Sequence, residues 1–217
     1  MAFVWSYKGK IKQRQPYFQE LARNFGLGYQ EKDEEGFVTF LKDIKIFKIG
    51  RPQKQINNIV FSEEDDPMEN FYFFDYHYVI STGNSTQIID QTVFFGQSKK
   101  LLLPEFELVP KSFFHRVGEF FGRKKPDLGD PWLTEKFLLK TESPKVLEWI
   151  NEKEFLDILE RNPKLRIYGY NFQLVLFKHR KLAKRQTLQT VFHSYRTLYE
   201  FFKSRKDFLK GGLDQAK

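Results

Sequence analysis

The sequence predicts an α+β fold in which helices cover an aromatic-rich antiparallel sheet. Residues 71–95 hold two strand-like runs of aromatic and β-branched residues, joined by Thr-Gly-Asn-Ser, which is typical of a hairpin. Residues 184–206 carry apolar side chains at helical spacing, the strongest helical pattern in the chain. Strand patterns come before most of the helical ones, which favours α+β over a doubly wound parallel sheet.

Composition indicates a globular chain whose core is unusually rich in aromatic side chains. The 217 residues include 25 Phe, 10 Tyr and 3 Trp, and a chain of this length buries roughly 70 % of its unfolded surface. We expect one domain over residues 1–210 and a frayed tail over 211–217. The absence of cysteine excludes disulfides, thiol catalysis and cysteine-ligated metals, and is in keeping with a reducing compartment.

The N-terminal apolar run is too short for a signal peptide, and no stretch of 18 apolar residues runs without charge. We therefore expect a cytoplasmic protein without transmembrane helices. Peripheral attachment to a membrane is left open.

The N-terminal half contains one helical pattern and two strand patterns before the hairpin. Residues 15–30 predict an amphipathic helix with Pro16 in its first turn and Gly26 after its end. Residues 37–49 alternate like one bent strand or two short ones, and residues 55–61 predict a further strand. The acidic residues between 63 and 69 lack the alternation and the Gly of a calcium loop, so a solvated turn is favoured and no metal is expected.

Further elements follow the hairpin. Ser143 and Pro144 are typical of a helix start, as N-cap and first helical residue. A second hairpin is expected at 165–178, turning near residues 169–171. The other expected elements are an interrupted strand at 101–110, a helix at 111–122 and a strand at 136–140.

The helix expected at 111–122 has two interpretations. Its five apolar positions form one face, which suits a core helix packed on the sheet. Alternatively it lies in a membrane interface, with lysines at the headgroups. The membrane-contact residues of that alternative are Phe113, Phe114, Phe120, Phe121, Lys124 and Lys125.

The net charge of +8 is concentrated near the C-terminus. Residues 178–217 hold 11 Lys/Arg and 3 Asp/Glu, whereas the other 25 Lys/Arg and 25 Asp/Glu cancel. This stretch is either a solvated face or a binding surface for anionic lipid or, as the alternative, nucleic acid. On one flank of the apolar stripe, Arg185, Arg196 and Lys203 align at helical spacing. The candidate anion-binding residues are Lys178, Arg180, Lys181, Lys184, Arg185, Arg196 and Lys203.

One pair of residues suggests acid–base chemistry. A two-residue turn at Gly83 and Asn84 places His77 opposite Asp90, and Asp75 opposite Thr92. A carboxylate beside an imidazole can orient it as a general base. The plainer interpretation is a cross-strand polar pair on the solvent face, worth about 0.2–1 kcal/mol.

The stretch from residue 92 to 177 resembles the soluble portion of a group of uncharacterised bacterial proteins. The resemblance is carried by LPEFELVPKSFFHRVGEFFG, Asp127, Pro131, KFLLK, the capped helix at Ser143 and LRIYGYNFQLVLF. Members of that group often carry this portion after membrane-spanning helices. The resemblance implies an accessory role at a membrane and no known activity.

Together these observations favour a non-enzymatic binding or accessory module that needs no cofactor. The expected partner is anionic lipid or a membrane protein. Nucleic-acid binding is the alternative, and an enzyme that uses His77 and Asp90 is the third hypothesis.

Overall fold

The computed structural model describes residues 2–34, 36–41, 44, 47–48, 54–81, 83, 85–111 and 127–205. The helix expected at 111–122, with its six candidate membrane-contact residues, lies outside these ranges after Lys111. Asn84 of the expected turn and the expected tail at 211–217 also lie outside them.

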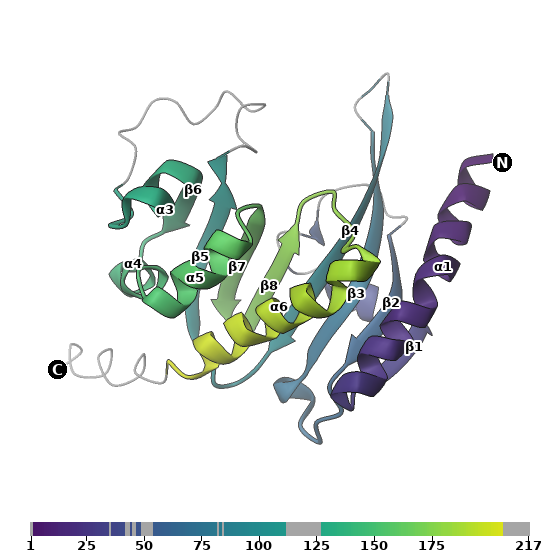
Figure 1. Cartoon of the computed structure of the whole chain (residues 1–217), viewed down its shortest axis with the longest axis horizontal. Helices are drawn as coiled ribbons and strands as arrows, with labels where there is room; N and C mark the ends of the chain where they lie inside the picture. Colours follow the sequence, from purple (N-terminus) through teal and green to yellow (C-terminus); the bar gives the residue numbers. More distant parts are fainter. Residues whose placement is uncertain are drawn as a thin grey trace. The chain divides into compact units, whose positions relative to one another are not determined.

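The strands are hydrogen bonded in the order β1-β2-β3-β4-β8-β7-β5-β6, and helices accompany them (Figure 1). The sheet is antiparallel, so the predicted α+β class is confirmed. Two compact units divide the chain: residues 1–94 with 180–192, and residues 95–179 with 193–217. We call them unit 1 and unit 2; the expectation of one domain over 1–210 stays a prediction.

Unit 1 begins with α1 (Ala2–Phe25), which packs on strands β1 and β2 (Figure 1). Phe18 and Leu21 of α1 are fully buried, and the ring of Phe18 stacks on that of Phe73 at 5.7 Å. The other elements are β1 (Gly28–Lys32), α2 (Phe37–Leu41), β2 (Gln55–Phe61), a 3-10 turn (Pro67–Glu69), β3 (Phe71–Ser81) and most of β4 (Thr86–Gln97).

The hairpin predicted at 71–95 is confirmed as β3 and β4, which are neighbours in the sheet. Gly83, between the strands, has a φ of 69°, the left-handed conformation that glycine adopts without strain. The strand predicted at 55–61 is confirmed as β2. Its register shifts between Asn57 and Val60, where Asn58 has a φ of 53°.

Two N-terminal expectations are wrong. The first helix spans Ala2–Phe25, so Pro16 lies inside it and not in its first turn. An interior proline costs about 3 kcal/mol, which the burial of Phe18 and Leu21 offsets. Residues 37–41 form helix α2 and no strand, because the carboxylate of Asp33 accepts hydrogen bonds from the backbone N–H groups of Phe37 and Val38 at 2.8 and 2.7 Å.

Unit 2 contains the end of β4, the elements that follow it as far as β8, and the chain again from residue 193. Its elements are β5 (Leu103–Pro110), α3 (Pro131–Lys136), β6 (Phe137–Thr141), α4 (Pro144–Ile150), α5 (Lys153–Arg161), β7 (Leu165–Asn171) and β8 (Gln173–Lys178). The predicted hairpin at 165–178 is confirmed. Helix α3 was not expected; Asp130 caps it by accepting from the N–H of Leu133 at 2.8 Å. Ser143 precedes α4 as expected, but its side chain makes no capping hydrogen bond.

The long helix near the C-terminus is α6 (Leu188–Lys203), preceded by a 3-10 turn (Arg185–Thr187). Its residues up to Phe192 belong to unit 1, and the rest belong to unit 2. The apolar stripe is buried as predicted: Phe192 meets the rings of Phe25, Phe71 and Phe73 in unit 1. In unit 2, Phe202 meets the rings of Phe106, Trp149, Phe155 and Phe201.

Candidate functional site

An ion pair with a buried carboxylate joins α1 to β3 in unit 1. Arg14 of α1 donates from Nε to Asp75 Oδ2 of β3 at 2.6 Å and from Nη2 to Asp75 Oδ1 at 3.1 Å. The Asp75 side chain is 1 % exposed and that of Arg14 is 14 % exposed. Bidentate pairing of this kind gives the strongest and most directional contact available to a carboxylate.

Two neutral side chains complete the surroundings of Asp75. Thr92 Oγ1 of β4 donates to Asp75 Oδ1 at 2.7 Å, and Asn58 Nδ2 of β2 donates to Asp75 Oδ2 at 3.3 Å. The predicted opposition of Asp75 and Thr92 is thus observed. Arg14 and Asn58 were missed from the sequence, because no local pattern connects Arg14 to a strand 61 residues away or reveals the register shift at Asn58.

This cluster fixes the chain where it returns to unit 1 after β8. Arg14 Nη1 donates to the carbonyl oxygen of Ala183 at 2.8 Å, and the N–H of Ala183 donates to Thr92 Oγ1 at 2.9 Å. The N–H of Thr92 donates to the carbonyl oxygen of Lys181 at 3.0 Å. An extended stretch is therefore tied by its backbone to α1 and β4, which leaves its side chains available.

Those side chains are cationic. We call residues 180–185 the basic segment; Arg180, Lys181, Lys184 and Arg185 are all exposed. Arg180 Nη2 donates to Gln87 Oε1 at 2.7 Å, and the guanidinium of Arg185 lies 4.5 Å from the ring centre of Tyr17. The segment lies in a run of sequence from residue 161 to 199 that holds nine Lys/Arg and no Asp/Glu. It is thus a fixed patch of positive charge without a neighbouring acid in the sequence.

The other candidate cations have different surroundings. Lys178 is half-buried and donates from Nζ to Asn162 Oδ1 at 2.9 Å; burial, with the charge of Lys164 second, lowers its pKa. Lys203 lies 3.7 Å from Glu200 Oε2, and Arg196 is half-buried. Arg185 precedes α6, so helical spacing does not align it with Arg196 and Lys203. The basic segment is where exposed cations gather.

The structure also brings together His77 and Asp90, whose facing atoms Nδ1 and Oδ1 are 2.7 Å apart. The side chains are 10 % and 21 % exposed, so the pair is not on an open solvent face. Neither residue contributes to the cleft described below. The carboxylate orients the imidazole, and an acid–base role for the pair stays a prediction.

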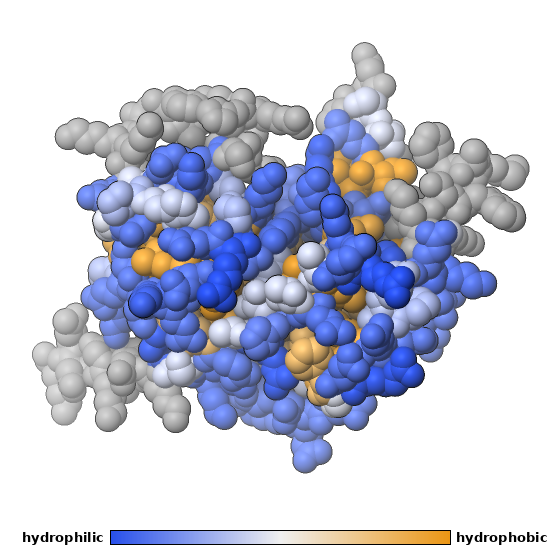
Figure 2. Space-filling view, in the orientation of Figure 1, coloured by the Kyte–Doolittle hydropathy of each residue, from blue (hydrophilic) through white to orange (hydrophobic). Residues whose placement is uncertain are grey.

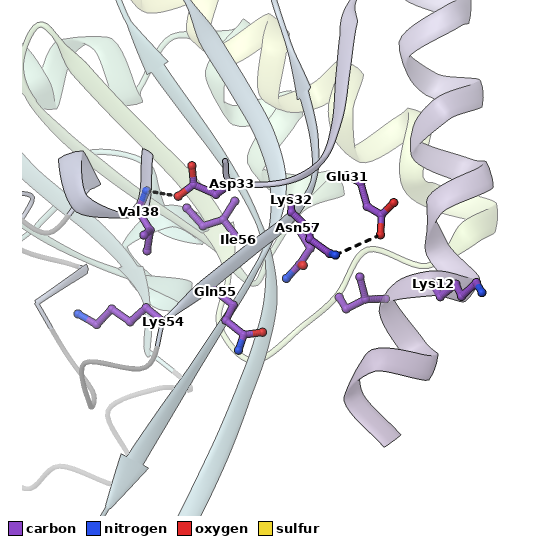
Figure 3. Close-up of a pocket in the computed structure, with 10 residues that line it drawn as sticks. Lys12, Glu31, Lys32, Asp33, Val38, Lys54, Gln55, Ile56 and Asn57 are labelled. Atoms are coloured by element: carbon purple, nitrogen blue, oxygen red, sulfur yellow. Dashed lines mark hydrogen bonds and ion pairs between the residues drawn. The ribbon is translucent and has the colours of Figure 1, made fainter. Parts of the chain in front are cut away.

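A cleft of about 430 Å³ opens among α1, β1, α2 and β2 (Figure 3). It contains three lysines and two acids, and four of these five side chains have polar partners in the structure. Lys54 Nζ donates to the carbonyl oxygen of Phe47, and Lys32 Nζ lies 3.9 Å from Glu31 Oε1. Asp33 caps α2. The lining residues are Ile11, Lys12, Glu31, Lys32, Asp33, Val38, Lys54, Gln55, Ile56 and Asn57, none of which the sequence had indicated.

The surface is mainly hydrophilic on the face shown in Figure 2, with hydrophobic side chains in separate patches. Within the described ranges, three large hydrophobic side chains are exposed: Ile88 (43 %), Tyr170 (44 %) and Phe172 (37 %). No helix in these ranges is both long and apolar enough to span a membrane.

Comparison with known proteins gives a likeness of fold. No protein-family model matches the chain, and no curated protein matches it. The crystal structure of the mycobacterial trehalose monomycolate transport factor A, TtfA, matches with a TM-score of 0.50 at 12 % identity. The match covers 86 % of this chain and 93 % of that one. At this identity the likeness concerns the fold alone.

Proposed function

We propose that this chain is a non-enzymatic binding or accessory module that attaches to an anionic membrane surface through its basic segment. The observation that carries the proposal is the fixed, acid-free group of exposed cations at residues 180–185. Each basic residue close to an anionic lipid surface contributes about 1 kcal/mol of attraction. Because the backbone is already tied down by Arg14 and Thr92, little ordering entropy opposes binding.

Two further points support the membrane as the partner. The solved protein of similar fold is a factor in the transport of a lipid, trehalose monomycolate. The proposal also includes the resemblance of residues 92–177 to the soluble portion of a group of uncharacterised bacterial proteins, whose members often carry this portion after membrane-spanning helices. We place the chain in the cytoplasm, at the periphery of the membrane.

Co-sedimentation with vesicles tests the proposal. The wild-type chain should bind vesicles of phosphatidylglycerol mixed with phosphatidylcholine, release them as salt rises, and ignore pure phosphatidylcholine. Lys181→Gln combined with Lys184→Gln should weaken binding by about 30-fold, from about 1 kcal/mol for each lysine. Lys140→Gln combined with Lys153→Gln removes the same charge from exposed sites elsewhere and should have a much smaller effect.

Competition with duplex DNA separates the two classes of anionic partner. DNA is added until its phosphate charge equals the lipid charge of the anionic vesicles. If it then displaces the chain, the basic segment binds nucleic acid or binds anions without specificity. Equal losses in both double variants would show that net charge alone acts, without a particular surface.

A further inference from the structure

A second feature, in unit 2, combines exposed aromatic rings with lysines. Two of the three exposed large hydrophobic side chains belong to the tight turn between β7 and β8: Phe172 lies in the turn, and Tyr170 pairs with Gln173 next to it. Asn171 between them has a φ of 51°, which reverses the chain tightly. The two rings are thereby presented at the end of a short hairpin.

A neighbouring turn brings positive charge to the same end of the strands. The N–H of Ser98 donates to the carbonyl oxygen of Phe172 at 2.9 Å, and Leu103 pairs with Asn171. Residues 98–101 form a turn closed by the N–H of Leu101 and the carbonyl oxygen of Ser98 at 3.1 Å. Lys99 and Lys100 occupy its two central positions and are exposed.

Buried side chains and a hydrogen bond fix the turn at residues 98–101. Ser98 is fully buried and Leu101 is 1 % exposed, and Ser98 Oγ accepts from the N–H of Lys100 at 3.0 Å. Glu105, exposed on the adjacent strand β5, is outnumbered by the two lysines. The rings and charges therefore form a small, preorganised surface, which we call the aromatic tip: Lys99, Lys100, Tyr170 and Phe172.

We infer that the aromatic tip inserts into the interfacial region of an anionic bilayer. Aromatic side chains favour the headgroup level of a membrane, where an apolar ring and a polar edge are both satisfied. Lysines beside them suit anionic headgroups and would be repelled by a cationic partner. This inference rests on the proposed function, which names the membrane as the partner.

A site-specific probe tests insertion directly. The chain has no cysteine, so Phe172→Cys provides a unique position for an environment-sensitive fluorophore. Ile88→Cys, at the third exposed hydrophobic residue, is the matched control in unit 1. With phosphatidylglycerol–phosphatidylcholine vesicles, the probe at position 172 should shift to the blue and be quenched by nitroxide-labelled lipid, whereas the probe at position 88 should stay in water.

The double variant Tyr170→Ser/Phe172→Ser gives an independent measure in the absence of a label. It should bind the same vesicles about tenfold more weakly, and Ile88→Ser should bind like the wild type. Circular dichroism confirms that each variant is folded. The loss should persist at raised salt, because ionic screening weakens charge attraction but not ring burial.

The outcomes separate this inference from the proposed function. Vesicle binding by the wild type, with an unquenched probe at position 172, overturns the inference and leaves the basic segment as the attachment. Failure of the wild-type chain to bind any anionic vesicle overturns both. Quenching at both positions would mean non-specific adsorption and would also overturn the inference.

Discussion

Replacing Arg14 with methionine should destabilise unit 1 by about 3 kcal/mol. Asp75 is 1 % exposed and would lose its only charged donor among the described residues, keeping only Thr92 and Asn58. Removing one partner of a buried ion pair costs about 3–5 kcal/mol, because the remaining charge is left without compensation. We take the lower end, since two neutral donors remain.

The pair Arg166–Glu107 in unit 2 is the matched control. Arg166 is as enclosed as Arg14, at 15 % exposed against 14 %, but its partner Glu107 is 27 % exposed. Arg166→Met should therefore cost about 1 kcal/mol or less, as is usual for pairs in contact with water. The difference between the two losses of unfolding free energy therefore measures the effect of burying the carboxylate.

Urea unfolding followed by circular dichroism measures both variants, and hydrogen exchange locates the effect. In Arg14→Met, exchange should quicken in β3, in β4 and around Ala183, whose carbonyl loses the Nη1 donor. Adding Asp75→Asn to Arg14→Met should recover part of the loss. A cost for Arg14→Met no larger than that for Arg166→Met would refute the reasoning.

Two other predictions concern aromatic residues that are wholly or partly buried. Burial, first among the causes, raises the pKa of Tyr29 and Tyr168 from 10.0 to about 12. Folding keeps these phenols neutral, so their contribution to stability is complete below pH 10 and lost as the pH rises towards 12. Tyrosinate absorbance should therefore rise together with loss of circular dichroism, and reversible titration of all tyrosines near pH 10 in a folded chain would contradict this. Gly169→Ala should cost about 1–3 kcal/mol in urea unfolding, because its Cβ would meet the buried ring of Phe106; an unchanged midpoint would show that the ring moves aside.

Local sequence signals predicted the hairpin and its register well. A turn at Gly83 fixes which residues of two adjacent strands face each other, so the pairs His77–Asp90 and Asp75–Thr92 follow by counting. The period of α6 was equally clear, because one side of that helix is buried along its whole length.

Contacts between distant segments could not be predicted in this way. The partner of Asp75 is Arg14, 61 residues away, and no periodicity connects a helix residue to a strand residue. The sequence signal for the basic segment was its charge, but the exposure of its four cations depends on where Arg14 and Thr92 hold the backbone. The strand pattern of residues 37–41 was overridden by the cap from Asp33.

The return of the chain to unit 1 has a consequence for biosynthesis. Arg14 and Ala183, which share a hydrogen bond, are 169 residues apart in the chain. At about 5–20 residues per second, a ribosome needs roughly 10–30 s to make the segment that separates them. Throughout that interval the nascent unit 1 lacks residues 180–192, which complete it, and chaperones can bind it. Nascent chains should consequently gain both protease resistance and affinity for anionic vesicles late in translation, within the same few dozen codons.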